Sequence, residues 1–170
     1  MKQYKRILII GCCGAGKSTL SFKLAKILNL PIYHLDKIYW KTGWIKSRKD
    51  EYIPKVKEIV KKDKWIIDGN LKSTFDIRML RADLILFFDF PTRVCLFRII
   101  KRRFLAKHRQ DMAEGCNERL NWGFLKYVWN FKKEINPIIW EVKEKYAQKA
   151  EFVCFKNDKE VNNWLEKFKY

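Results

Sequence analysis

A nine-residue stretch near the start of the chain, GCCGAGKST at residues 11–19, constrains the fold more than any other part of the sequence. It matches the pattern G-x-x-x-x-G-K-[ST], with the lysine at Lys17 and the hydroxyl residue at Ser18. A random chain of this length would contain the pattern less than about 1% of the time. The apolar run 7–10 precedes it, and apolar residues at helical spacing follow it over 17–28. A strand, a glycine-rich turn and a helix are the context in which this pattern binds phosphate.

The chemistry of a phosphate site explains the residue types in this loop. Glycine lets the backbone turn with its N–H groups pointing inward, and the following helix places its positive dipole end there. Lys17 is predicted to reach the β- and γ-phosphates of ATP, Ser18 to bind Mg²⁺, and Thr19 to support the α-phosphate. The predicted nucleotide-binding residues of the loop are Gly11, Cys12, Cys13, Gly14, Ala15, Gly16, Lys17, Ser18 and Thr19.

Further short apolar runs alternate with helical patterns along the rest of the chain. Buried strands are predicted at about 32–34, 65–67, 84–88 and 152–155. Helices are predicted at about 49–62, 92–107, 118–131 and 134–147, and Asp158 is expected to cap a last helix that reaches Phe168. This alternation predicts one α/β domain over residues 1–170 with a mostly parallel sheet. The helical stretch at about 104–149 is long for a simple crossover, so we expect an inserted lid there.

Three aspartates, Asp36, Asp68 and Asp89, each follow an apolar strand. Ligands of open α/β sheets bind beyond the carboxyl ends of the strands, so all three are candidates for the site. Position alone leaves Asp68 and Asp89 open as the carboxylate that serves Mg²⁺, and each has a cap or turn role as its alternative. Asp36 opens a polar–aromatic loop that suits an acceptor pocket, where it would orient a hydroxyl. His34 is expected to pack at a strand end.

The segment from Phe90 to Gln110 carries seven Lys or Arg residues and no acid. Arg98 and Arg102 are four residues apart, so they share one helix face. Arginine suits the charge that spreads over the oxygens of a transferred phosphoryl group, and Arg98, Arg102 and Arg109 are predicted to act there from the lid. The alternative is a basic helix that faces solvent.

The net charge and the cysteine content limit which partners and which cellular compartment we expect. The 37 Lys and Arg residues against 19 Asp and Glu residues give a formal net charge of +18, which favours polyanions such as nucleotides and, secondarily, nucleic acid. A solvated lysine-rich surface is the alternative. The five cysteines show neither metal-site spacing nor a disulfide framework, and no long apolar run is present. We expect a cytoplasmic protein without membrane contact, a monomer or a homodimer.

Five segments together resemble the FlaR-type DNA topology modulation proteins: GCCGAGKSTLSFKLAKIL, LPIYHLDKIYWKTGW, WIIDGN, LILFFDFP and DMAEGCNERLNWGFLKYVWNF. That family is similar to the adenylate kinase and nucleoside monophosphate kinase group of P-loop proteins. The resemblance runs from about Lys5 to Phe131 and more weakly beyond. It implies a three-layer P-loop kinase fold with a five-stranded parallel sheet. In that sheet the P-loop strand lies beside the WIID strand, which favours Asp68 over Asp89 for Mg²⁺.

The resemblance also implies two binding segments. One, from Asp36 to about Trp44, would hold the acceptor, and the other, from about Lys156 to Asp158 and including Asn157, would pack on the adenine. The kinase signature DGFPR is not present, because Asn70 follows the Asp-Gly pair, so acceptor identity cannot be transferred. The sequence therefore predicts an ATP-dependent kinase for a small acceptor, a nucleotide or nucleoside. The alternative is an ATP-binding, nucleic-acid-associated regulator that uses the loop as a switch.

Overall fold

Five parallel strands form the central sheet of the computed structural model, which describes residues 4–105, 111–116 and 120–168. The strands are β1 (Arg6–Gly11), β2 (Ile32–His34), β5 (Trp65–Asp68), β6 (Leu84–Phe88) and β7 (Glu151–Phe155). Their order is β2-β5-β1-β6-β7, so β1 lies between β5 and β6. The predicted fold class is confirmed, including the pairing of the P-loop strand with the WIID strand, in which Ile9 lies opposite Asp68.

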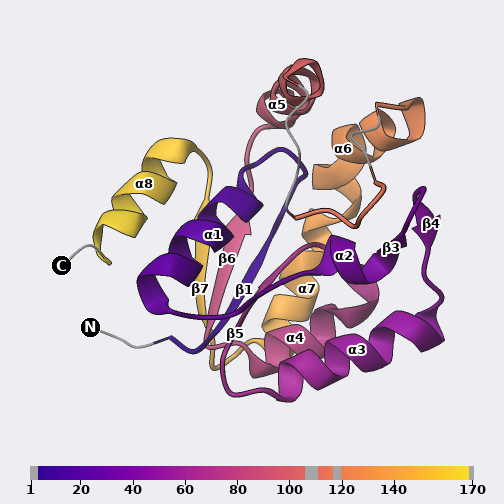
Figure 1. The fold of residues 1–170 in the computed structure, drawn as a ribbon. Helices are drawn as coiled ribbons and strands as arrows, with labels where there is room; N and C mark the ends of the chain where they lie inside the picture. Colours follow the sequence, from indigo (N-terminus) through magenta and orange to yellow (C-terminus); the bar gives the residue numbers. More distant parts are fainter. Residues whose placement is uncertain (1–3, 106–110, 117–119, 169–170) are drawn as a thin grey trace.

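Helices cover both faces of the sheet (Figure 1). On one side lie α1 (Lys17–Leu28) and α8 (Asp158–Glu166); on the other, α4 (Phe75–Arg81) packs against α7 (Asn136–Tyr146), with α3 (Lys49–Lys61) beside α4. The helices α5 (Thr92–Phe104) and α6 (Trp122–Glu134) pack on each other beyond the carboxyl ends of the strands, at the top of Figure 1. The P-loop lies at this same end of the sheet.

Burial explains why the strand sequences lack alternation. All residues of β5 and β6 are buried, and so is β1 after its first residue, because helices cover both faces. The edge strands β2 and β7 are only partly buried. The core extends into the region expected as a lid, since Val128 of α6 and Ile139 of α7 are both fully buried in it. No helix in the described part of the chain is long and apolar enough to cross a membrane.

Several short elements escaped the sequence analysis. The segment after β2, expected to be a loop, forms α2 (Leu35–Tyr39) and a hairpin of β3 (Trp40–Lys41) and β4 (Ile45–Lys46). The 3₁₀-helix η1 (Lys72–Thr74) and α4 follow β5. Elements of two to seven residues are too short to show a helical period or an alternation.

The predicted start of the last helix is wrong by one residue. Asn157 is the N-cap, since its side-chain oxygen accepts from the Glu160 backbone N–H at 3.0 Å, and Asp158 is the first helical residue. The end of the helix predicted at 92–107 and the start of the one predicted at 118–131 fall partly outside the described residues.

Candidate active site

The turn between β1 and α1 has a backbone that only glycine accommodates easily. Gly14 has φ +80°, and a Cβ there would lie 2.6 Å from the carbonyl oxygen of Cys95 on α5. Gly16 has φ +102° and is the N-cap of α1. The loop is therefore both tightly packed on α5 and wound into the left-handed conformation that leads into a helix. This is the local geometry that the phosphate-binding pattern predicts.

Lys17 lies folded over this loop, with its Nζ donating to the carbonyl oxygen of Cys12 at 3.1 Å. Burial by itself lowers the pKa of Lys17, but the negative groups of Cys13, Asp68 and Asp36 raise it overall. The ammonium is therefore charged at neutral pH and stands in the electrostatic field of two carboxylates. Asp36 follows β2, and Asp68 is the last residue of the neighbouring strand β5.

The two candidate metal carboxylates have different surroundings. Asp68 is 5% exposed, and its Oδ2 lies 3.2 Å from Nδ1 of His34, which packs on the ring of Phe22. His34 was expected only to pack, so its pairing with Asp68 was missed. Because the pair lies across neighbouring strands β2 and β5, only the sheet order could have revealed it.

Asp89 is surrounded by cations and an amide. It accepts from Asn136 Nδ2 at 2.8 Å, pairs with Lys132 Nζ at 3.0 Å and also binds Lys156. Burial raises the pKa of Asp89, but these three donors outweigh it and lower the pKa below its usual value. The Asp89 carboxylate thus joins the end of β6 to α6, α7 and the residue after β7.

Asn70 holds the first glycine of the P-loop in a two-way hydrogen bond. Its Oδ1 accepts from the Gly11 N–H at 2.9 Å, and its Nδ2 donates to the Gly11 carbonyl at 2.6 Å. The departure from DGFPR therefore has a structural role. The only signal in the sequence is the asparagine itself, because its partner lies 59 residues away.

A fully buried arginine supports the loop that carries Asn70. Arg78 of α4 donates to the carbonyl oxygens of Gly69 at 3.0 Å, Leu71 at 2.9 Å and Thr74 at 3.1 Å. Burial lowers the pKa of Arg78 to about 9, although Asp76 and Asp68 oppose the shift. The carbonyls satisfy the guanidinium and fix the course of the chain after β5.

Tyr127 brings α6 into the site. Burial raises its pKa, and the nearby Cys13, Cys12 and Asp36 raise it further, while a hydrogen bond with Asn70 opposes them. Its hydroxyl therefore remains protonated at physiological pH. The sequence analysis assigned no role to Tyr127.

The structure places the predicted arginines and Asn157 in different surroundings. Arg98 Nη1 donates to the P-loop carbonyl of Ala15 at 3.4 Å, and Arg98 also pairs with Asp158. Arg102 is half-buried one turn further along α5, and Arg109 lies outside the described residues. The Asn157 amide caps α8 through its Oδ1, and its Nδ2 donates to Glu160 Oε1 at 2.8 Å. Its predicted contact with adenine remains a prediction.

Ser18 has a partner that the sequence analysis did not foresee. Its hydroxyl donates to Oδ2 of Asp111 at 2.7 Å, across 93 residues of chain.

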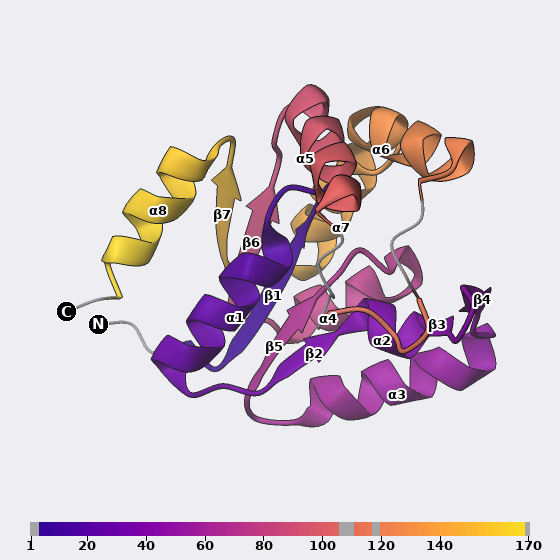
Figure 2. The ribbon, with the colours of Figure 1, turned by 45° about the horizontal axis from the view of Figure 1, so that its top comes forward.

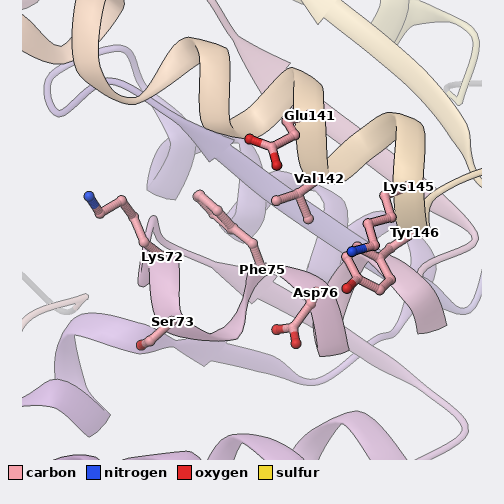
Figure 3. A pocket seen from close by; sticks show the side chains of 8 residues that line it. All are labelled: Lys72, Ser73, Phe75, Asp76, Glu141, Val142, Lys145 and Tyr146. Carbon is pink, nitrogen blue, oxygen red and sulfur yellow. The ribbon is translucent and has the colours of Figure 1, made fainter.

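Away from this site, a cavity of about 350 Å³ lies between η1–α4 and α7, and Figure 3 shows its charged lining of Lys72, Lys145, Asp76 and Glu141. This cavity contains none of the predicted site residues.

The glycine-rich loop at the end of β1 and the strand order define a protein of the P-loop kinase fold. Three solved shikimate kinases share it. The enzyme of Acinetobacter baumannii, in complex with shikimate, has a TM-score of 0.59 and 15% identity over 97% of this chain and 94% of that chain. The enzyme of Bacteroides thetaiotaomicron has a TM-score of 0.53 and 18% identity, and the match covers 96% of this chain and 99% of that chain. The enzyme of Aquifex aeolicus has a TM-score of 0.51 and 21% identity, and the match covers 95% of this chain and 96% of that chain.

No model of a protein family matches the chain. The uncharacterized protein YqaC of Bacillus subtilis (strain 168) is 33% identical over 138 residues, which span 73% of this chain and 71% of that protein. The chain therefore belongs to the same family as YqaC.

Proposed function

We propose that the protein is a P-loop kinase-like enzyme that transfers the γ-phosphoryl group of ATP to a small acceptor. The observation that carries this proposal is the P-loop after β1 with Lys17 folded over it, while Asp36 follows β2 and Asp68 ends β5 on the same side of β1 in the sheet. Both carboxylates raise the pKa of the lysine. A charged lysine over a glycine-rich loop, with two carboxylates from the ends of neighbouring strands, supplies the positioning and electrostatic stabilisation that phosphoryl transfer needs.

Each part of the site has a role in this proposal. The loop N–H groups and Lys17 bind and orient the phosphates. Ser18 and Asp68 are the proposed oxygen donors for Mg²⁺, since hydroxyl and carboxylate oxygens suit this ion, which offsets phosphate charge when bound. Arg98, already in contact with the loop, is the arginine best placed to meet charge on the transferred group.

The acceptor side is proposed to form around Asp36 and Tyr127. Asp36 would accept a proton from an acceptor hydroxyl or orient it, and the protonated Tyr127 would donate a hydrogen bond. This chemistry fits a small hydroxylated molecule, including the nucleosides and nucleotides expected from the sequence. The Acinetobacter structure, which holds the hydroxylated acid shikimate, supports testing that class as well.

We also propose one domain over residues 1–170, with a lid that is narrower than the expected 104–149. Ile139 and Ala147 belong to the central core, so α7 is fixed to the sheet. Val128 of α6 is buried in the same core, so a moving part would have to end before this residue. Arg109 lies outside the described residues, and the role predicted for it remains a prediction.

The direct test is transfer of labelled phosphate from ATP to a panel of nucleosides, nucleotides, sugars and hydroxy acids with Mg²⁺ present. We expect at least one acceptor to gain label, and Lys17→Ala to lower the rate by about 10²- to 10³-fold. Lys23→Ala, an exposed lysine on the same helix, is the matched control. A wild-type protein that neither binds ATP nor labels any acceptor would contradict the proposal.

The nucleic-acid-associated regulator remains the second prediction, and it rests on the net charge of +18 and the resemblance to topology modulation proteins. It requires duplex DNA binding that weakens steeply with salt and changes when an ATP analogue is added. Binding of labelled duplex at 50 and 200 mM salt, with and without the analogue, tests it. Affinity that does not respond to the analogue would count against this function.

A further inference from the structure

We propose that Asp111 is the positioning carboxylate of the metal site: it holds the Ser18 hydroxyl so that its oxygen faces the cation of the bound nucleotide. This inference rests on the proposed function, because it concerns the Mg²⁺ that would accompany ATP. It adds to that function a residue from outside the sheet and the P-loop.

The hydrogen bond between Ser18 and Asp111 has a defined direction. An ionised carboxylate only accepts, so at 2.7 Å the serine must donate its single proton to Asp111 Oδ2. Both lone pairs of the serine oxygen then remain for other partners. A cation needs lone pairs and no proton, so this arrangement leaves the hydroxyl ready as a metal ligand. Groups that orient a metal ligand in this way tune metal affinity strongly.

The burial of Asp111 supports a specific role. It is 8% exposed, although it belongs to the irregular segment 111–116 between α5 and α6. Burying a carboxylate costs free energy unless charges or hydrogen bonds compensate. A magnesium ion bound beside Ser18 would favour a negative group here. Glu114 of the same segment is exposed, so the segment does not bury its acids indiscriminately.

The other end of the same segment is attached to the predicted acceptor side. The Cys116 thiol donates to the carbonyl oxygen of Lys41 at 3.3 Å. Gly115, with φ +71°, lies so close to Thr42 that a Cβ would come within 2.5 Å of its Cγ2. Residues 111–116 therefore connect Ser18 at the nucleotide end with the β3–β4 hairpin. A change in the position of Asp111 when the metal binds would be transmitted to the hairpin.

The experiment measures the affinity for a non-hydrolysable ATP analogue twice, with Mg²⁺ and with EDTA. The ratio of the two dissociation constants isolates the contribution of the metal. We expect Asp111→Asn to reduce this ratio by about 10-fold or more, as for other groups that orient metal ligands, and Ser18→Ala to reduce it similarly. The double variant should lose little more than either single one, because the two residues act through one hydrogen bond. Glu114→Gln is the charge-matched control.

The metal-free affinity separates a specific effect from misfolding. In EDTA we expect Asp111→Asn to bind the analogue with the same affinity as the wild type. This result would show that the P-loop of the variant is intact. Mn²⁺ titration followed by electron paramagnetic resonance in the presence of the analogue gives a second readout, in which the variant should bind Mn²⁺ at least several-fold more weakly. An unchanged ratio and unchanged Mn²⁺ affinity, or a loss confined to the metal-free affinity, would overturn the inference. A wild type without analogue binding would instead overturn the proposed function.

Discussion

The ends of β5 and β6 look alike in sequence and differ in the structure. Each is an apolar strand that pairs with β1 and ends in an aspartate. Asp68, at the end of β5, lies beside His34 and interacts electrostatically with Lys17. Asp89, at the end of β6, is bound by Lys132, Lys156 and Asn136.

This difference shows that the role of a carboxylate at the end of a strand cannot be assigned from its position on that strand alone. Asp89 is paired with two lysines, one from α6 and one from just after β7, and accepts from an amide of α7, which makes it a junction of the fold. The partner of Asp68 is His34, and no lysine or arginine side chain among the described residues pairs with it. Figure 2 shows how α6 and α7 approach the β6 side of the sheet, whereas β5 lies toward α2.

The first prediction has the largest expected effect, and it compares the activities of variants at the ends of β5 and β6. Asp68→Asn should lower phosphoryl transfer by about 10²- to 10³-fold, because it removes a charge from the proposed metal and lysine site. Asp89→Asn should lower it by less than about 10-fold under the same assay. Steady-state rates at saturating ATP measure both. Equal losses in the two variants would show that the two strand ends have the same role.

A second prediction concerns what supports the β5 end. Arg78→Met should lower the free energy of unfolding by about 3–5 kcal/mol, since it leaves several buried carbonyl oxygens without donors. Arg81→Met, at an exposed position of the same helix, should change it by less than about 0.5 kcal/mol. Urea titrations with a common m-value measure the difference. Equal stability of the two variants would mean that water or backbone rearrangement replaces the guanidinium.

A third prediction tests the β6 end by stability. Asp89→Asn should cost about 1–2 kcal/mol, because two lysines and an amide lose a charged acceptor. The exposed pair of Arg48 and Asp50 provides the control, and Asp50→Asn should have little effect on unfolding. If Asp89→Asn proves as stable as wild type but inactive, the assignment of Asp89 as a fold junction is wrong.

The smallest effect is the pH dependence of the same junction. The pKa of Asp89 is lowered in the folded state, so its contribution to stability is complete above the unfolded value of about 4. It is lost as the pH falls through the lower folded pKa. The stability gap between wild type and Asp89→Asn should therefore be constant from pH 7 to 5 and shrink toward pH 3. Urea midpoints at these pH values measure the gap, and one that persists unchanged to pH 3 contradicts the ion cluster.

The parts of the fold that could be predicted are those encoded locally. The P-loop and the buried strands follow from residue types within a few positions of one another. Ser18 and Asp111 meet across 93 residues, and Gly11 and Asn70 across 59. Neither pair leaves a periodic pattern, so the sequence analysis found the loop but not the residues that orient it. Tyr127 was missed for the same reason, because its spacing in α6 is that of an ordinary packing residue.

The amide clamp on Gly11 has a consequence for motion. Because one asparagine side chain bonds both backbone groups of that glycine, the loop after β5 and the start of the P-loop must open together. The Gly11 N–H should then exchange with solvent deuterium only during such a joint opening. Asn70→Ala should release this amide into fast exchange while the β1 amides stay protected, which makes Gly11 a natural reporter of the resting state of the loop.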